Sequence, residues 1–206
     1  SAPGADAFRW FFLASSAPWN TRRHSLANVR AIQKDFPLKL RNVYSFFTIY
    51  ANIDGYKASV RADQKGVLDR YVLAKTRELV EQIEARLDAN DLPGAYAVVP
   101  YYIDALNNWY IRRSRECFWG VDLDRDAFDT LYTVLHTLTR VAAPLLPFLA
   151  EEVYRGLTGE ESVHLTDWPQ PDLLPADDDL VRRMDRVREV CSAALSLREA
   201  RNLRVR

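Results

Sequence analysis

Apolar residues recur every three or four positions along most of the chain, the spacing of helices with one buried face. The clearest case is the segment from Pro100 to Gly120. Read as a helix at about 100° per residue, it places on one side Val99, Tyr102, Ile103, Leu106, Trp109, Tyr110 and Cys117. Asn108, Arg112 and Arg115 fall on the opposite side. We therefore predict a helix with one face in a core and a row of cationic and amide donors on the other.

Arg113 is the exception to this division, because it falls on the apolar side between Trp109 and Cys117. A guanidinium inside a core must be paired, since leaving it unpaired costs several kcal/mol. We therefore expect Arg113 at the core margin with a carboxylate from another helix. Arg113 is also expected to matter more for stability than Arg112.

The rest of the chain shows the same periodicity, with helix-start and helix-stop residues between the periodic runs. Helices are predicted over residues 6–14, from Ser25 to about Asp54 with a kink near Pro37, over 68–90, from Gly94 with a bend at Pro100, from Asp122 or Asp124 to the break at Ala143–Pro144, from Pro147 to about Leu157, and from about Asp177 onward. In the last helix the residues expected to face inward are Leu180, Met184, Val187, Cys191 and Ala194. No strand pattern occurs beyond a short ribbon near Val163, so we predict an all-α helical bundle.

The charges of the chain balance, with 28 Lys and Arg against 28 Asp and Glu. This excludes a protein that binds any polyanion through a general positive field, so a nucleic-acid site would need a local excess of cations. Such an excess occurs in residues 180–206, which contain eight Arg and three acidic residues. No apolar run approaches the roughly 20 residues of a membrane-spanning helix, so no membrane association is predicted.

No catalytic or metal-binding constellation is predicted. Glu161 and His164 have the Glu-x-x-His spacing of di-iron bundles, but such a site needs a second copy and further Glu from facing helices. Cys117 and Cys191 lack metal-ligand spacing and are expected to be small buried thiols of a cytosolic protein. The chain also lacks a Gly-rich phosphate loop and a nucleophile–base pair.

Two polar strips are the candidate binding surfaces. Their residues are Asn108, Arg112 and Arg115 on one helix and Arg41, Asn42, Ser45 and Phe46 on the outer side of another. Guanidinium groups bind phosphate oxygens bidentately and aromatic rings stack on bases, so both strips suit RNA. The competing hypothesis is a helical scaffold whose strips contact other proteins. Salt dependence separates the two, because phosphate contacts weaken steeply with salt.

Several short motifs follow one another in order across nearly the whole chain. They are Gly4–Trp10 (GADAFRW), Ser15–Trp19 (SSAPW), Arg41–Phe47 (RNVYSFF), Asn108–Arg115 (NWYIRRSR) with Phe118–Trp119 (FW), Ala143–Glu152 (APLLPFLAEE) and Val163–Pro169 (VHLTDWP). In this order and spacing they resemble the anticodon-binding helical domain of class I aminoacyl-tRNA synthetases. The run from Trp109 to Arg113 resembles the isoleucyl branch, because the valyl branch tends to have an acidic residue where Arg112 stands.

This resemblance implies that the full-length protein is an enzyme that joins isoleucine to its tRNA with ATP and Mg²⁺, and that the present chain is non-catalytic and holds no cofactor. Its partners would be the anticodon stem-loop of isoleucine tRNA and the other domains of the same synthetase, in a cytoplasmic monomer. Residues 1–20 would form a connector helix after the catalytic domain, and residues 21–206 the anticodon-binding bundle. A zinc-bearing extension, common in the family, would follow Arg206. The same domain of a valyl-type synthetase is the alternative within the family.

The resemblance also implies which residues contact the tRNA. In the related valyl enzyme, a Phe that matches Phe46 in the Asn-x-x-x-Phe pattern stacks at the anticodon end. The contacts expected at the anticodon are therefore Asn42, Ser45 and Phe46. Those expected to the RNA backbone are Arg41, Asn108, Arg112 and Arg115.

Overall fold

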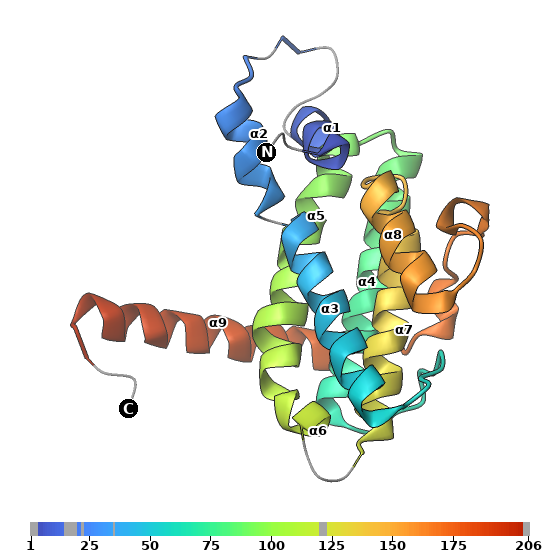
Figure 1. Ribbon diagram of the computed structural model, residues 1–206. Coiled ribbons are helices and arrows are strands. Elements are labelled where there is room, and N and C mark those ends of the chain that lie inside the picture. Colours follow the sequence, from blue (N-terminus) through green and yellow to red (C-terminus); the bar gives the residue numbers. More distant parts are fainter. Residues whose placement is uncertain (1–3, 15–19, 22, 35, 120–122, 204–206) are drawn as a thin grey trace.

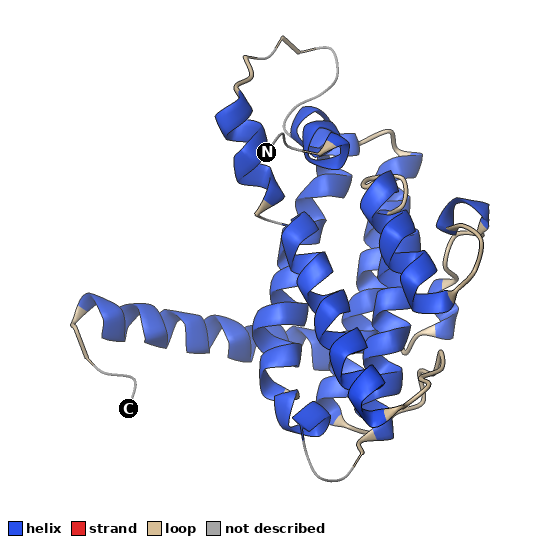
Figure 2. Ribbon diagram, viewed as in Figure 1, coloured by secondary structure: helices blue, strands red, loops and turns tan. Residues whose placement is uncertain are grey.

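The computed structural model describes residues 4–14, 20–21, 23–34, 36–119 and 123–203. Within these residues the chain is helical and contains no strand (Figure 2). The α-helices are α1 (Ala5–Ala14), α2 (Leu26–Gln33), α3 (Phe36–Asp54), α4 (Val67–Asp88), α5 (Leu92–Asp104), α6 (Arg115–Trp119), α7 (Arg125–Ala142), α8 (Pro147–Thr158) and α9 (Asp178–Ala200). A π-helix, η1 (Ala105–Ile111), continues α5, and two 3-10 helices, η2 (Val163–Leu165) and η3 (Pro171–Leu173), precede α9. The all-α prediction is confirmed, and the ribbon expected near Val163 is the helix η2 instead.

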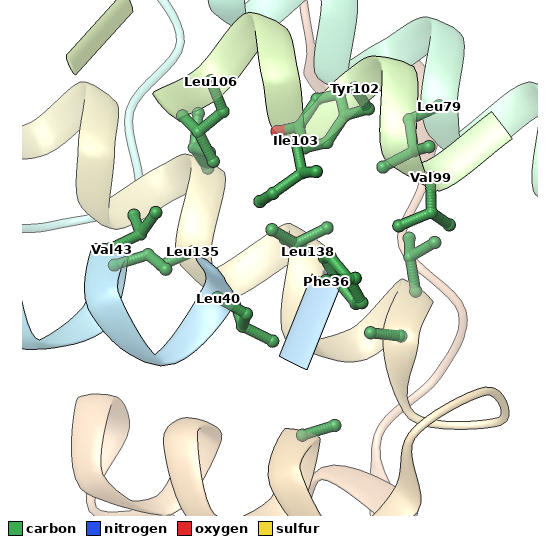
Figure 3. Close-up of a cluster of buried hydrophobic side chains, with 14 of the residues drawn as sticks. Phe36, Leu40, Val43, Leu79, Val99, Tyr102, Ile103, Leu106, Leu135 and Leu138 are labelled. Carbon is green, nitrogen blue, oxygen red and sulfur yellow. The ribbon is translucent and has the colours of Figure 1, made fainter. Parts of the chain in front are cut away.

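The core lies between α3, α4, α5 and α7, which run side by side along the bundle, while α8 packs against α3 and α7 (Figure 1). The side chains that meet there are aliphatic or aromatic, and they include Phe36, Leu40, Val43, Leu79, Val99, Tyr102, Ile103, Leu106, Leu135 and Leu138 (Figure 3). Burying one such side chain stabilises the fold by about 1.5–3 kcal/mol. The inward faces are therefore fixed, and only the outward faces are left for binding.

The long helix expected from Ser25 to Asp54 is two helices. Ser25 caps the first as predicted, because its hydroxyl accepts the backbone N–H of Asn28 at 3.2 Å. That helix ends at Gln33, and α3 begins at Phe36 with Pro37 in its first turn. A proline is favourable in a first turn, where its missing N–H has no intrahelical acceptor to lose. The proline therefore starts a helix rather than kinking one.

The first helix is attached to the bundle through the N-terminus of α8. The Asp6 carboxylate accepts the backbone N–H groups of Phe148 at 3.3 Å and of Leu149 at 2.7 Å. It supplies the cap that α8 lacks locally, since the N-cap residue Leu146 has no acceptor side chain. Arg9 adds a hydrogen bond to the carbonyl oxygen of Pro144 at 3.0 Å. Thus α1 packs on the turn between α7 and α8.

A buried carboxylate on α7 helps to hold the segment between α3 and α4 in place. Asp129, 2% exposed, accepts hydrogen bonds from the Tyr56 hydroxyl at 3.1 Å, the Ser59 backbone N–H at 2.9 Å and the Arg61 guanidinium at 3.1 Å. All three donors lie in the segment that connects the two helices. Thr133, also on α7, accepts the Arg61 backbone N–H at 2.8 Å and donates to the Arg61 carbonyl oxygen at 2.9 Å, so two α7 side chains order a connection that has no helix of its own.

We expect Asp129→Ala to lower the free energy of unfolding by roughly 1–3 kcal/mol, because it leaves these donors without their acceptor. Asp126→Ala is the matched control, since Asp126 contacts the same Arg61 guanidinium at 3.3 Å but is half exposed. Its loss should stay within about 0.5 kcal/mol. Urea unfolding of the two variants measures both values. Equal losses would show that burial of Asp129 is not what makes it important.

Candidate nucleic-acid interface

The outer face of α3 carries four of the predicted binding residues. Its inner face is fixed by the buried residues Phe36, Leu40, Val43, Phe47 and Ala51. The helical spacing then turns Arg41, Asn42 and Ser45 out to solvent and leaves Phe46 half-buried. The predicted orientation of this strip thus agrees with the structure, although its four side chains differ in what they contact.

Arg41 is turned toward α8, where its Nη2 atom lies 2.8 and 2.9 Å from the two carboxylate oxygens of Glu152. Both side chains are more than half exposed, so this ion pair stabilises the fold by at most about 1 kcal/mol. A phosphate group can compete with such a weakly held carboxylate. The charge of Arg41 is nevertheless neutralised in the free protein.

Phe46 joins α3 to α6 through ring contacts. Its ring centroid lies 4.9 Å from that of Tyr50 and 5.0 Å from that of Phe118, which it meets edge-on. Phe118 is buried, so Phe46 lies at the margin of the core. A base can therefore reach only part of the ring that the sequence pattern assigns to stacking.

The short helix α6 places Arg115 and Trp119 on one side, because they are four residues apart. The guanidinium carbon of Arg115 lies 5.5 Å from the Trp119 ring centroid. On α3, the Tyr50 ring lies 6.1 Å from the same Trp119 ring. The helix α6, which carries Arg115, lies at the end of the bundle and contacts the C-terminal part of α3 (Figure 1). We call this region, with Phe46, the α3–α6 end.

Asn108 and Arg112 line a different feature, an open groove of about 1580 Å³ between α4, α5–η1 and α9. The Asn108 amide donates a hydrogen bond to Asp104 at 2.5 Å. Two other cations of the groove, Lys75 and Arg188, are held by carboxylates, whereas Arg112 is exposed and has no ion pair within the described residues. The seven predicted residues thus form two surfaces, which adjoin where η1 leads into α6.

Arg113 is exposed, and no carboxylate of the described residues pairs with it, so the ion pair expected with another helix is absent from that part of the chain. Its guanidinium carbon lies 3.2 Å from the centroid of the Trp109 ring, and Nη1 donates to the Asn108 carbonyl oxygen at 3.5 Å. The cause is the π-helix η1, in which each N–H bonds the carbonyl five residues earlier instead of four. The extra residue shifts the buried face by one position, so that Ser114 is buried in place of Arg113.

The helix α9 crosses the bundle near its own N-terminus and projects away from it toward its C-terminus (Figure 1). Asp185 is the acceptor that attaches it: it receives hydrogen bonds from Tyr71 and Lys75 at 2.7 Å and from Arg188 at 2.8 Å. Arg188 also reaches Asp104 on α5 at 2.7 Å. A single polar network therefore connects α9 to α4 and α5.

The inward face of α9 is shorter than predicted. Val181 is buried, whereas Val187 and Ala194, both expected to face inward, are exposed. Half-buried residues complete the contact, namely Leu180, Met184 and Cys191. A helix that crosses a bundle meets it over only a few turns, so periodicity alone overestimates how much of such a helix is buried.

The described residues contain no group of three or more His, Cys, Asp or Glu side chains that could hold a metal ion. The Nε2 atom of His164 lies 3.1 Å from the Pro147 carbonyl oxygen.

Burial, together with a hydrogen bond to Asp124, raises the pKa of the Cys117 thiol to about 11, so this thiol is protonated and a weak nucleophile at neutral pH. In the part of the chain that the structure describes, no helix is long and apolar enough to cross a membrane.

A family model described as the anticodon-binding domain of tRNA ligase matches residues 69–206. The chain belongs to this family. It is similar to isoleucine–tRNA ligases of Leifsonia xyli subsp. xyli, Mycobacterium tuberculosis H37Rv and Wolbachia pipientis wMel, with 52%, 50% and 43% identity over 98% of the chain. It spans 19%, about a fifth, of the length of each of these relatives.

The fold of this anticodon-binding domain is also found in a crystal structure of the ternary complex of LeuRS from Agrobacterium radiobacter K84 with tRNA and LeuAMS. The match has a TM-score of 0.60 and covers 87% of this chain and 20% of that one, at 18% identity. The family match begins in α4, so the α3 strip lies outside it. The isoleucine–tRNA ligase relatives, in contrast, match 98% of the chain.

The attachment of α9 to this domain depends on the charge of Asp185. Burial alone would raise the pKa of Asp185, but hydrogen bonds from Lys75 and Tyr71 hold the pKa below its ordinary value. A carboxylate with a lowered pKa stabilises the fold fully above its ordinary pKa, and this contribution is lost as the pH falls through the lowered value. The network is therefore complete at neutral pH.

We expect Asp185→Ala to speed hydrogen–deuterium exchange in the N-terminal half of α9, because Lys75, Tyr71 and Arg188 lose their shared acceptor. The local opening free energy should fall by roughly 1–3 kcal/mol. Glu189→Ala is the control, since Glu189 pairs with Arg186 and both side chains are well exposed. Mass spectrometry of peptides from α9 measures the effect. Equal exchange in the two variants would contradict this role of Asp185.

Proposed function

We propose that this chain is the anticodon-binding domain of an isoleucine–tRNA ligase and that it binds the anticodon stem-loop of isoleucine tRNA. The observation that carries the proposal is the identity of about half the residues to isoleucine–tRNA ligases over nearly the whole chain, a span that includes both candidate surfaces. The exposed guanidiniums of Arg112 and Arg115 support it. Neither forms an ion pair within the described residues, which leaves both able to bind phosphate.

Within this proposal the predicted residues have different tasks. Arg112 and Arg115 hold phosphate groups of the stem-loop, and Asn42 and Ser45 offer exposed hydrogen-bonding groups on α3. Phe46 supports the α3–α6 end from the core margin and offers a base only part of its ring. Two residues already have partners, and they contact RNA by exchanging them, namely Arg41 (Glu152) and Asn108 (Asp104).

The larger protein, in this proposal, is a cytoplasmic monomer that attaches isoleucine to tRNA with ATP and Mg²⁺. The present chain then supplies RNA binding and no chemistry. Residues 1–20 connect to a catalytic domain, and residues 21–206 form the binding bundle. The attachment of α1 through Asp6 supports a connector that is held rigidly on the bundle.

We expect the chain to bind an anticodon stem-loop of isoleucine tRNA with an affinity that falls steeply with salt. Arg112→Gln and Arg115→Gln should each weaken binding and reduce the slope of log K against log salt by about 0.7–0.9, the value for one phosphate contact. Fluorescence anisotropy with a labelled stem-loop, titrated at several salt concentrations, measures both the affinity and the slope.

Arg183→Gln is the matched control, because Arg183 is an exposed α9 arginine paired with Asp179. It should leave the slope unchanged. If the wild-type chain shows no binding even at low salt, the proposed function is wrong. If it binds but the two substitutions behave like Arg183→Gln, these guanidiniums do not contact phosphate.

A further inference from the structure

We propose that the indole ring of Trp119 is the surface on which one unpaired base of the RNA stacks, with Arg115 beside it for the phosphate of that nucleotide. This inference rests on the proposed RNA-binding function and assigns a residue that the sequence pattern did not. It also moves the stacking position from Phe46 to α6.

The exposure of Trp119 is the first support for this assignment. Trp119 is 53% exposed, whereas Trp10 and Trp109 are buried and Trp168 is packed against the core. A large aromatic ring in water forgoes the stabilisation that burial would provide, about 25 cal/mol per Å² of apolar surface. The open face of this ring is the kind of surface that bases stack on in single-stranded RNA.

A continuous series of ring contacts holds Trp119 in place. It begins at Phe128 in the core and passes through Phe118, Phe46 and Tyr50 to Trp119, with centroid distances of 4.9, 5.0, 4.9 and 6.1 Å. Phe118 and Phe128 are buried, so the series starts in the core. We call the Trp119 ring, together with the rings behind it, the platform. Phe46 supports this platform from the core side, and Trp119 presents its exposed ring face to the base.

The neighbours of Trp119 favour a nucleotide as the ligand. The Arg115 guanidinium carbon is 5.5 Å from the ring centroid, and Arg115 has no ion pair within the described ranges. An aromatic face with an uncommitted guanidinium beside it matches a base and its phosphate. The base must be unpaired, because the faces of paired bases are covered within a helix. Stacking tolerates any base, so Trp119 should add affinity and little base selectivity.

The test uses the 206-residue chain, the isoleucine stem-loop and variants of Trp119. Trp119→Ala should weaken binding about 5- to 150-fold, the range of one base–aromatic stack. Trp119→Phe should retain most of the affinity, whereas Trp119→Leu, which is apolar without a π face, should behave like Trp119→Ala. Phe148→Ala is the control, because Phe148 is a 69% exposed ring on α8, outside both candidate surfaces, and its affinity should be unchanged.

Abasic substitution of each loop nucleotide in turn identifies the stacked base. At one loop position, removal of the base should weaken binding to the wild-type chain and have no further effect on Trp119→Ala, since the two changes remove the same contact. Circular dichroism and thermal unfolding check that the variants remain folded. With Trp119 largely exposed, the unfolding temperature should change little.

The outcomes separate this inference from the function on which it rests. If the wild-type chain binds the stem-loop and Trp119→Ala binds equally well, the platform is wrong and the proposed function stands. If Phe148→Ala loses affinity instead, the base lies against α8, and the platform is again wrong. Equal penalties at every abasic position in both proteins would show that no base stacks on Trp119. No binding by the wild-type chain overturns both proposals.

Discussion

The continuous helix formed by α5 and η1 is buried on two sides, and the placement of both candidate surfaces follows from this constraint. One side contributes Tyr102, Ile103, Leu106 and Tyr110 to the main core, and the other contributes Ala105 and Trp109 to a small core beneath α9. The π-helical turn accommodates one extra residue. After it, the residues that face the core come one position later in the sequence than in a regular α-helix. Beyond η1, Arg112 and Arg115 are exposed, and there the groove and the α3–α6 end adjoin.

Much of the bundle could be predicted from the sequence, because several helices carry their own start signals. Ser25, Asp124 and Asp177 cap helices as expected, with hydrogen bonds to backbone N–H groups three residues later. The errors have local physical causes. The π-helix breaks the 3.6-residue period, so Arg113 and Cys117 were assigned to positions that Ser114 and Phe118 occupy. Buried positions that are counted along the sequence from one end of a helix are therefore assigned wrongly beyond a π-helical turn.

The candidate site was less predictable, because a helical face does not show what a charged side chain contacts across the bundle. Arg41 and Arg112 have the same appearance in sequence, but Glu152 of α8 pairs with Arg41, while Arg112 has no carboxylate partner within the described residues. In the same way, Phe46 is covered by rings from α3 and α6, whereas Trp119 is open. One sequence signal did exist, the spacing of four residues between Arg115 and Trp119. In a net-neutral domain, electrostatic binding depends on the few cations that the fold leaves unpaired.

Photo-crosslinking of the chain to a stem-loop that carries a photoreactive uridine in its loop tests most directly whether the RNA loop meets the α3–α6 end. Peptide mapping by mass spectrometry then locates the protein residues joined to the RNA. The account predicts crosslinks in residues 41–54 of α3 and in residues 111–119, which end in α6. Crosslinks confined to α8 or to the projecting half of α9 would contradict it.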